Sequence, residues 1–152
     1  MLNRIKASAI PIWVNVLVVV LMLFMAIQVY WNYFDHQVLL DSGITIAGKP
    51  DQNVLFTTAG RLVAMIGASL LVLYTQNAAQ FVVVLFMSAL REGQEMFIDP
   101  LYPMADAATS PVVDAVVHVV IVSAEIAALV VVARLARSER NRDAAPVAVP
   151  AS

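Results

Sequence analysis

Ionisable side chains recur at helical spacing in residues 91–99, which read Arg-Glu-Gly-Gln-Glu-Met-Phe-Ile-Asp. This stretch directly continues an apolar run at 81–90. Glu92, Glu95 and Asp99 are three and seven residues apart, so on a helix they share one face. An ionised side chain in the middle of a bilayer costs at least about 2.5 kcal/mol, so this face is too polar to contact lipid. It therefore marks the interior of a membrane protein.

A second set of ionisable residues lies on the last apolar segment of the chain. Asp114, His118 and Glu125 are four and eleven residues apart, and about 100° of rotation per residue places them on one face. A carboxylic acid beside a carboxylate and a histidine can transfer protons, so the two sets indicate acid/base chemistry. The candidate catalytic residues are Glu95, Glu125, His118 and Glu92.

Polar residues on the first two apolar segments complete the candidate site. Gln28, Asn32 and Asp35 are four and seven residues apart, and His36 follows them, while Arg61 lies near the start of the second segment. Two arginines in the site cannot neutralise six carboxylates, so some of the acids are available for proton transfer. The predicted ligand-binding residues are Arg61, Arg91, Asp99, Asp114, Gln28, Asn32, Asp35 and His36.

Four apolar segments must position these residues. The chain has 152 residues, of which 61% are hydrophobic and 13% charged, whereas soluble domains carry about 25% charged residues. We expect membrane helices at about 12–34, 55–74, 78–98 and 112–135, because about 20 residues span a ~30 Å hydrocarbon core. The first helix is expected to be retained, since its apolar core exceeds the roughly 15 residues of a signal peptide. The predicted fold class is an all-α, integral membrane four-helix bundle.

The segments outside the helices set the predicted orientation. Residues 1–11 form a basic lead, and residues 136–152 form a basic and then Ala/Pro-rich tail that we expect to be disordered. The connector at 35–53 is polar, with a short extended piece expected at 44–46. Because arginine and lysine concentrate at the two ends, the positive-inside rule places both termini in the cytoplasm of a multi-pass cell-membrane protein.

Composition also excludes several classes of site and partner. The chain has no cysteine, which rules out disulfides, thiolate zinc sites, iron–sulfur clusters and cysteine nucleophiles. A net charge of -2 with no central basic patch predicts no nucleic-acid partner. Glu-x-x-Glu at 92–95 and Asp-x-x-x-His at 114–118 offer oxygen and nitrogen ligands, but the Glu-x-x-His pattern of carboxylate metal bundles is absent. We therefore expect no metal and no cofactor; haem would need His36 or His118 as its axial ligand.

The chain resembles the small four-helix DoxX-like membrane proteins over roughly residues 14–135. The resemblance rests on the plan of four short helices with both termini inside, on Gly-Ile-Thr-Ile at 43–46, on Pro50, and on Gly60-Arg61 near the start of the second helix. Some members of that family are linked to quinone-coupled oxidation, which implies a quinone partner. Residues 91–100 have no counterpart in the family pattern. The chain is more distantly similar to emopamil-binding sterol isomerases, and no catalytic residue carries over from them.

Several functions remain open from the sequence. The first is a carboxylate-rich cleft in the outer half of the bundle that binds, or acts by acid/base chemistry on, a small lipophilic molecule such as a quinone, an isoprenoid or a sterol-like compound. The second is a non-catalytic subunit of a larger membrane complex or a homo-oligomer, with small residues at 60, 64, 67 and 68 in helix contacts. The third is proton-coupled transport by an oligomer. Pairing of Arg61 with Glu92 or Glu95 could also be purely structural.

Overall fold

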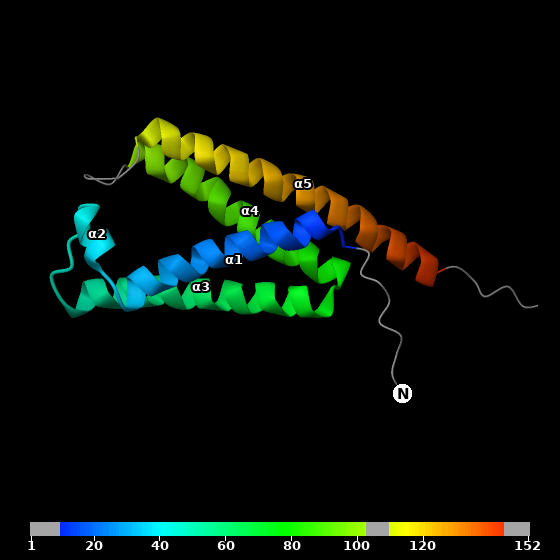
Figure 1. Cartoon of the computed structure of the whole chain (residues 1–152), viewed down its shortest axis with the longest axis horizontal. Coiled ribbons are helices and arrows are strands. Elements are labelled where there is room, and N and C mark those ends of the chain that lie inside the picture. The colour runs from blue at the N-terminus through cyan, green and yellow to red at the C-terminus, as the bar shows by residue number, and fades with distance from the viewer. Residues whose placement is uncertain (1–9, 103–109, 145–152) are drawn as a thin grey trace, which may run out of the picture.

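The computed structural model describes residues 10–102 and 110–144, and the elements within them are helices. In chain order these are α1 (Ile12–Tyr33), α2 (Gln37–Asp41), α3 (Lys49–Thr75), α4 (Ala78–Leu101) and α5 (Pro111–Asp143) (Figure 1). Helices α1, α3 and α5 are each long and apolar enough to cross a membrane. The charged residues 91–99 occupy the second half of α4. The chain is therefore all-helical over the described residues and has the composition of a membrane protein.

The four long helices pack as two antiparallel pairs. Helix α1 lies along α3, and α4 lies along α5, while contact between the two pairs is much narrower (Figure 1). The pairs approach each other at the end where α4 begins and separate toward the end that carries α2 (Figure 1). Polar side chains at the separated end therefore contact mainly residues of their own helix pair, and only a few polar contacts join the two pairs.

A small core forms where the two pairs meet. It is built by side chains from all four long helices, among them Val14, Val18, Val72, Phe81, Leu85, Ala128 and Val132. Many apolar side chains outside this core are exposed, including Val16, Leu70, Phe86 and Val120. Such an outward-facing apolar surface is expected of helices that lie in lipid, because the bilayer interior is as apolar as the side chains themselves.

A tight turn precedes α4, and side-chain N-caps mark the starts of α4 and α5. Gln76 adopts a left-handed conformation (φ 51°) after α3 and reverses the chain within a tight turn. The Asn77 side chain then accepts a hydrogen bond from the Gln80 backbone N–H, and Ser110 accepts one from Val113 in the same way at the start of α5. Both residue types are favoured at helix N-caps because they satisfy a free backbone donor.

Several predicted boundaries were wrong. Helix α3 begins at Lys49 rather than near 55, because Pro50 fits the first turn of a helix and Asp51 accepts the backbone N–H of Ala47 (2.7 Å). The segment 44–46 is not a strand. Helix α4 continues past 98 to Leu101, since Pro100 in the last turn forfeits only its own N–H bond.

The last helix is also longer than predicted. Helix α5 passes 135 and runs to Asp143, so residues 136–143 of the predicted tail are helical. Arginine and glutamate are good helix formers, and Arg140 and Arg142 in the last turn interact favourably with the helix dipole. The remainder of the predicted tail, 145–152, lies outside the described residues, as do residues 1–9 of the predicted lead.

Candidate functional site

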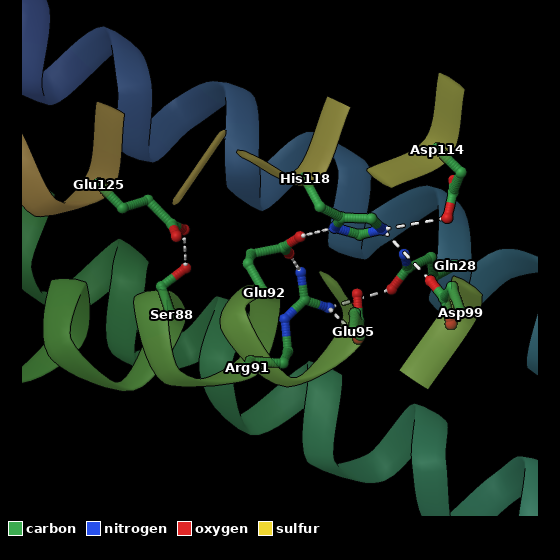
Figure 2. Close-up of polar contacts among 9 residues, drawn as sticks. All are labelled: Gln28, Ser88, Arg91, Glu92, Glu95, Asp99, Asp114, His118 and Glu125. Carbon is green, nitrogen blue, oxygen red and sulfur yellow. Dashed lines mark hydrogen bonds and ion pairs between the residues drawn. The ribbon is translucent and has the colours of Figure 1, made fainter. Parts of the chain in front are cut away.

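A chain of polar contacts links α1 to α4 and has Arg91 at its centre (Figure 2). Nη1 of Arg91 donates a hydrogen bond to Oε1 of Gln28 on α1 (3.2 Å) and lies 3.9 Å from Oε1 of Glu95. Nη2 of Arg91 forms an ion pair with the adjacent Glu92. Glu92 is only 4% exposed, so this pair lies in the interior and not on the lipid-facing surface.

The same chain of contacts continues from α4 to α5 through His118. Oε2 of Glu92 lies 3.1 Å from Nδ1 of His118. On the other side of the imidazole ring, Nε2 faces Oδ2 of Asp99 (3.3 Å) and Oδ2 of Asp114 (3.7 Å). One histidine therefore lies between a buried carboxylate and a pair of carboxylates from two helices, as Figure 2 shows.

Helix periodicity explains why these side chains meet. Glu92, Glu95 and Asp99 occupy successive turns of one face of α4, and Asp114 and His118 are one turn apart on α5. Because α4 and α5 run antiparallel along each other, the late turns of α4 lie beside the early turns of α5. Three of the sequence-predicted acids, Glu92, Asp99 and Asp114, therefore converge on one histidine.

A second polar contact lies deeper between α4 and α5. Oγ of Ser88 donates a hydrogen bond to Oε1 of Glu125 (2.6 Å), and Glu125 is fully buried. Its other oxygen, Oε2, and Nε of Arg91 are buried without a hydrogen-bond partner in the described part of the chain. No hydrogen bond between described residues joins Glu125 to His118, although both lie on the predicted face of α5.

A pocket opens on the other side of Arg91, between α1, α3 and α4. It has a volume of about 210 Å³ and is lined by Gln28, Thr58, Arg61, Leu62, Met65, Arg91 and Glu95. Four of the predicted site residues thus come together from three helices. Arg61 is exposed and forms no ion pair with any described residue, so the predicted pairing of Arg61 with Glu92 or Glu95 is absent. Arg91, and not Arg61, forms the ion pairs with Glu92 and Glu95.

Three predicted residues of the first helix do not join the network. Asn32 donates to the Gln28 carbonyl of its own helix (2.7 Å), and Nε2 of His36 lies 3.0 Å from the Asn32 carbonyl. Asp35 accepts the backbone N–H of Gln37 at the start of α2 (3.2 Å). These side chains support the junction of α1 and α2, because α1 packs along α3 and its end next to α2 is separated from α4 and α5 (Figure 1).

Sequence reasoning gave no role in the site to Ser88, Thr58 or Met65. Ser88 lies four residues before Glu92, on the same face of α4, and this spacing could have identified it as a partner for a buried acid. Thr58 and Met65 carry no comparable signal, because a threonine and a methionine on an apolar helix are most often packing residues.

Among the residues that the structure describes, two groups of side chains have the geometry to hold a cation. Glu92, Glu95 and His118 form one, and Asp99, Asp114 and His118 form the other; within each group the potential ligand atoms lie within 4.8 Å of one another. Glu95 belongs both to the first group and to the lining of the pocket, whereas Asp99, Asp114 and His118 do not line the pocket. The second group is therefore a part of the site that can act separately from the pocket.

The chain was also compared with known proteins. No family model, no curated protein and no solved structure matches it. Its function is therefore inferred from the geometry of the site.

Proposed function

We propose that the protein is a multi-pass four-helix bundle of the cell membrane, in which α1, α3, α4 and α5 all cross the bilayer. Three of them meet the length and composition of a membrane span, and α4 is covered by α5 along its charged face. Arginines at 134, 137, 140 and 142 gather at the end of α5, which the positive-inside rule assigns to the cytoplasm. An even number of crossings then places the N-terminus on the same side.

We propose further that the pocket between α1, α3 and α4 binds the polar end of a small lipophilic molecule. The observation that carries this proposal is the mixed lining of the pocket, where Leu62 and Met65 lie beside Arg61, Arg91 and Glu95. Ligand pockets in proteins combine an apolar wall with a few convergent polar groups in this way. The arginines would contact an oxygen of the ligand.

The size of the pocket indicates how such a molecule would lie. A volume of about 210 Å³ holds a head group but not a whole isoprenoid or sterol-like molecule. A second, apolar pocket of about 220 Å³ lies between α3 and α4 and shares Met65 with the first. Its other lining residues are Ala64, Ala68, Val83, Val84 and Met87. The apolar body of the ligand would extend from one pocket into the other.

Within this proposal the acidic residues have different roles. Glu95 lines the pocket, so it is the group that would exchange a proton with the ligand. Glu92 and His118 do not line it; they position Arg91 through the ion pair and the contact behind it. Glu125 is deeper and bonded to Ser88, so it is not placed to touch the ligand head. The resemblance to DoxX-like proteins makes a quinone the first ligand to look for.

Native mass spectrometry with lipidomics tests the proposal on protein extracted gently from its own membrane. The wild-type protein is expected to retain one lipophilic species, and Glu95→Gln is expected to lose it. Glu139→Gln is the matched control, because Glu139 is exposed near the far end of α5. Retention of the same phospholipids by all three proteins would contradict a specific pocket.

A second candidate function is that of a subunit in a larger membrane complex. It is favoured by the outer surface of α3, where Gly67 is exposed and a Cβ atom added to it would meet no other atom within 4 Å. A small residue with free space beside it allows another helix to approach closely in lipid. Co-purification of a second polypeptide at fixed stoichiometry would support this function, and a stable, monodisperse chain alone would count against it.

A further inference from the structure

We propose that Asp99, Asp114 and His118 bind a divalent first-row transition-metal ion. Asp99 lies in the last turn of α4, and Asp114 and His118 lie in the first turns of α5. Nε2 of His118 is 3.3 Å from Oδ2 of Asp99 and 3.7 Å from Oδ2 of Asp114. The three ligand atoms lie within 4.8 Å of one another, which is the separation of donors around one ion. This site is separate from the proposed lipophilic pocket, and none of its ligands lines that pocket.

The position of Glu92 gives the imidazole the tautomer that a metal requires. Oε2 of Glu92, a residue that is 4% exposed, lies 3.1 Å from Nδ1 of His118. Because an ionised carboxylate can only accept a hydrogen bond, this contact favours a proton on Nδ1. In the neutral ring the lone pair is then on Nε2, the nitrogen that faces the two aspartates. A carboxylate that orients a histidine from behind is the usual support of a metal-binding imidazole.

Without a cation, this arrangement has an excess of acceptors. The Nε2 lone pair and two carboxylate oxygens converge, and they have no donor among the described residues when the ring is neutral and both aspartates are ionised. One guanidinium and four carboxylates, those of Glu92, Glu95, Asp99 and Asp114, surround the ring, so a divalent ion would offset most of the local negative charge. Without a metal ion, a doubly protonated ring would supply the donors. Metal titration distinguishes a bound ion from a doubly protonated ring.

The geometry favours this set of ligands over the other one that contains His118. In the group of Glu92, Glu95 and His118, the guanidinium of Arg91 contacts both glutamates. A metal ion there would lie against a fixed positive charge. The aspartates have no such neighbour among the described residues, and their side chains are 41% and 33% exposed, which gives an ion a path from the aqueous phase.

The donor types narrow the class of ion. One imidazole nitrogen with two carboxylates suits Mn²⁺, Fe²⁺ or Zn²⁺, whereas Ca²⁺ and Mg²⁺ prefer sites made of oxygen alone. Three protein ligands also leave coordination positions for water. The sequence-based expectation of no metal rested on the missing Glu-x-x-His pattern; here the ligands come from Asp99 on one helix and Asp-x-x-x-His on its neighbour.

The test uses Mn²⁺ with the full-length protein in nanodiscs after removal of metals by a chelator. Continuous-wave EPR measures the stoichiometry and affinity, and pulsed EPR detects coupling to a ¹⁴N nucleus. We expect one tightly bound Mn²⁺ per chain with ¹⁴N coupling. Asp99→Asn and Asp114→Asn should each weaken binding by about tenfold or more. Asp41→Asn, which changes an exposed aspartate of α2 outside the site, should bind as the wild type does.

Two results would overturn the proposal. One is equally weak binding by wild type, Asp99→Asn and Asp41→Asn, and the other is bound Mn²⁺ without ¹⁴N coupling; either would assign His118 to ion pairs alone. Circular dichroism verifies that each variant is folded. The aspartates are partly exposed, so their variants keep the test usable if a His118→Gln variant does not fold. Retention of the lipophilic species by Asp99→Asn would show that the two sites are independent.

Discussion

Glu92 contacts two partners, Arg91 and His118, from a side chain that is almost completely buried. Its neighbour one turn later, Glu95, is partly exposed and lies 3.9 Å from the same arginine. The two glutamates are identical in chemistry and differ only in burial and in the number of partners. Burial determines how much an ion pair contributes to stability, because water does not solvate a charge that is left unpaired in the interior.

Replacement of Glu92 by glutamine is therefore expected to lower the free energy of unfolding by about 3 kcal/mol, since it leaves Arg91 without its buried counter-charge. Glu95→Gln removes a longer, more exposed ion pair and should cost less than about 1 kcal/mol. Reversible unfolding in mixed detergent micelles measures both. Equal losses of stability in the two variants would contradict the central position of Glu92.

Ser88→Ala is expected to destabilise the protein by about 1–3 kcal/mol, because it removes the hydrogen bond to Glu125, whose other oxygen already has no partner among the described residues. Ser123→Ala is the matched control. The Ser123 hydroxyl is exposed and donates to the Val119 carbonyl of its own helix (2.7 Å), so its loss should change stability by about 0.5 kcal/mol or less. Thermal unfolding of both variants measures the difference, and similar melting temperatures would show that the Ser88 bond contributes little.

Helix α4 is the element that joins both parts of the site, because its charged face contacts α5 and its Arg91 reaches α1. The spacing of acids in the sequence was sufficient to group Glu92 and Asp99 with His118, since helix periodicity alone places them on facing surfaces. It was not sufficient to choose Gln28 over Asn32, or Arg91 over Arg61. Those choices depend on how the α1–α3 pair packs against the α4–α5 pair, and this packing is set by the core where the two pairs meet.

The start of α4 is expected to control how well its charged face is positioned. Asn77→Ala removes the side-chain acceptor of the N-cap and should cost about 1 kcal/mol, whereas Asn77→Ser retains an acceptor and should be close to the wild type. Chemical unfolding of the two variants measures this difference. If alanine and serine behave alike, the cap seen in the structure does not contribute to stability.

The four long helices of the described chain form two pairs that share a core at one end, while the contacts of Arg91 and His118 lie toward the other end. Composition predicted an all-helical membrane protein; the described residues are all-helical in their regular elements, and three of the helices are long and apolar enough to cross a membrane. Helix ends were predicted less well, because residues 49–54 and 136–143 are polar and yet continue helices beyond the apolar segments. The polarity of a segment indicates whether it lies in lipid or in water, but it does not indicate whether the segment is helical.

Single-cysteine labelling tests the proposed topology, because the natural chain has no cysteine. In intact cells, a membrane-impermeant maleimide is expected to label Asp41→Cys and Tyr102→Cys. Ala79→Cys and Asn141→Cys should react only after permeabilisation, since they lie at the opposite ends of α4 and α5. All four positions are exposed on the protein surface. Labelling of positions 79 and 102 from the same side would show that α4 does not cross the membrane.

Photo-crosslinking inside the proposed pocket tests directly whether it binds a lipophilic molecule. A diazirine-bearing amino acid replaces Met65, which lines both the polar and the apolar pocket, and the protein is irradiated in living cells. The same amino acid at Tyr74, which is 89% exposed, reports the surrounding lipid. We expect an adduct of one lipophilic molecule at position 65 that is absent at position 74. Identical phospholipid adducts at both positions would contradict it.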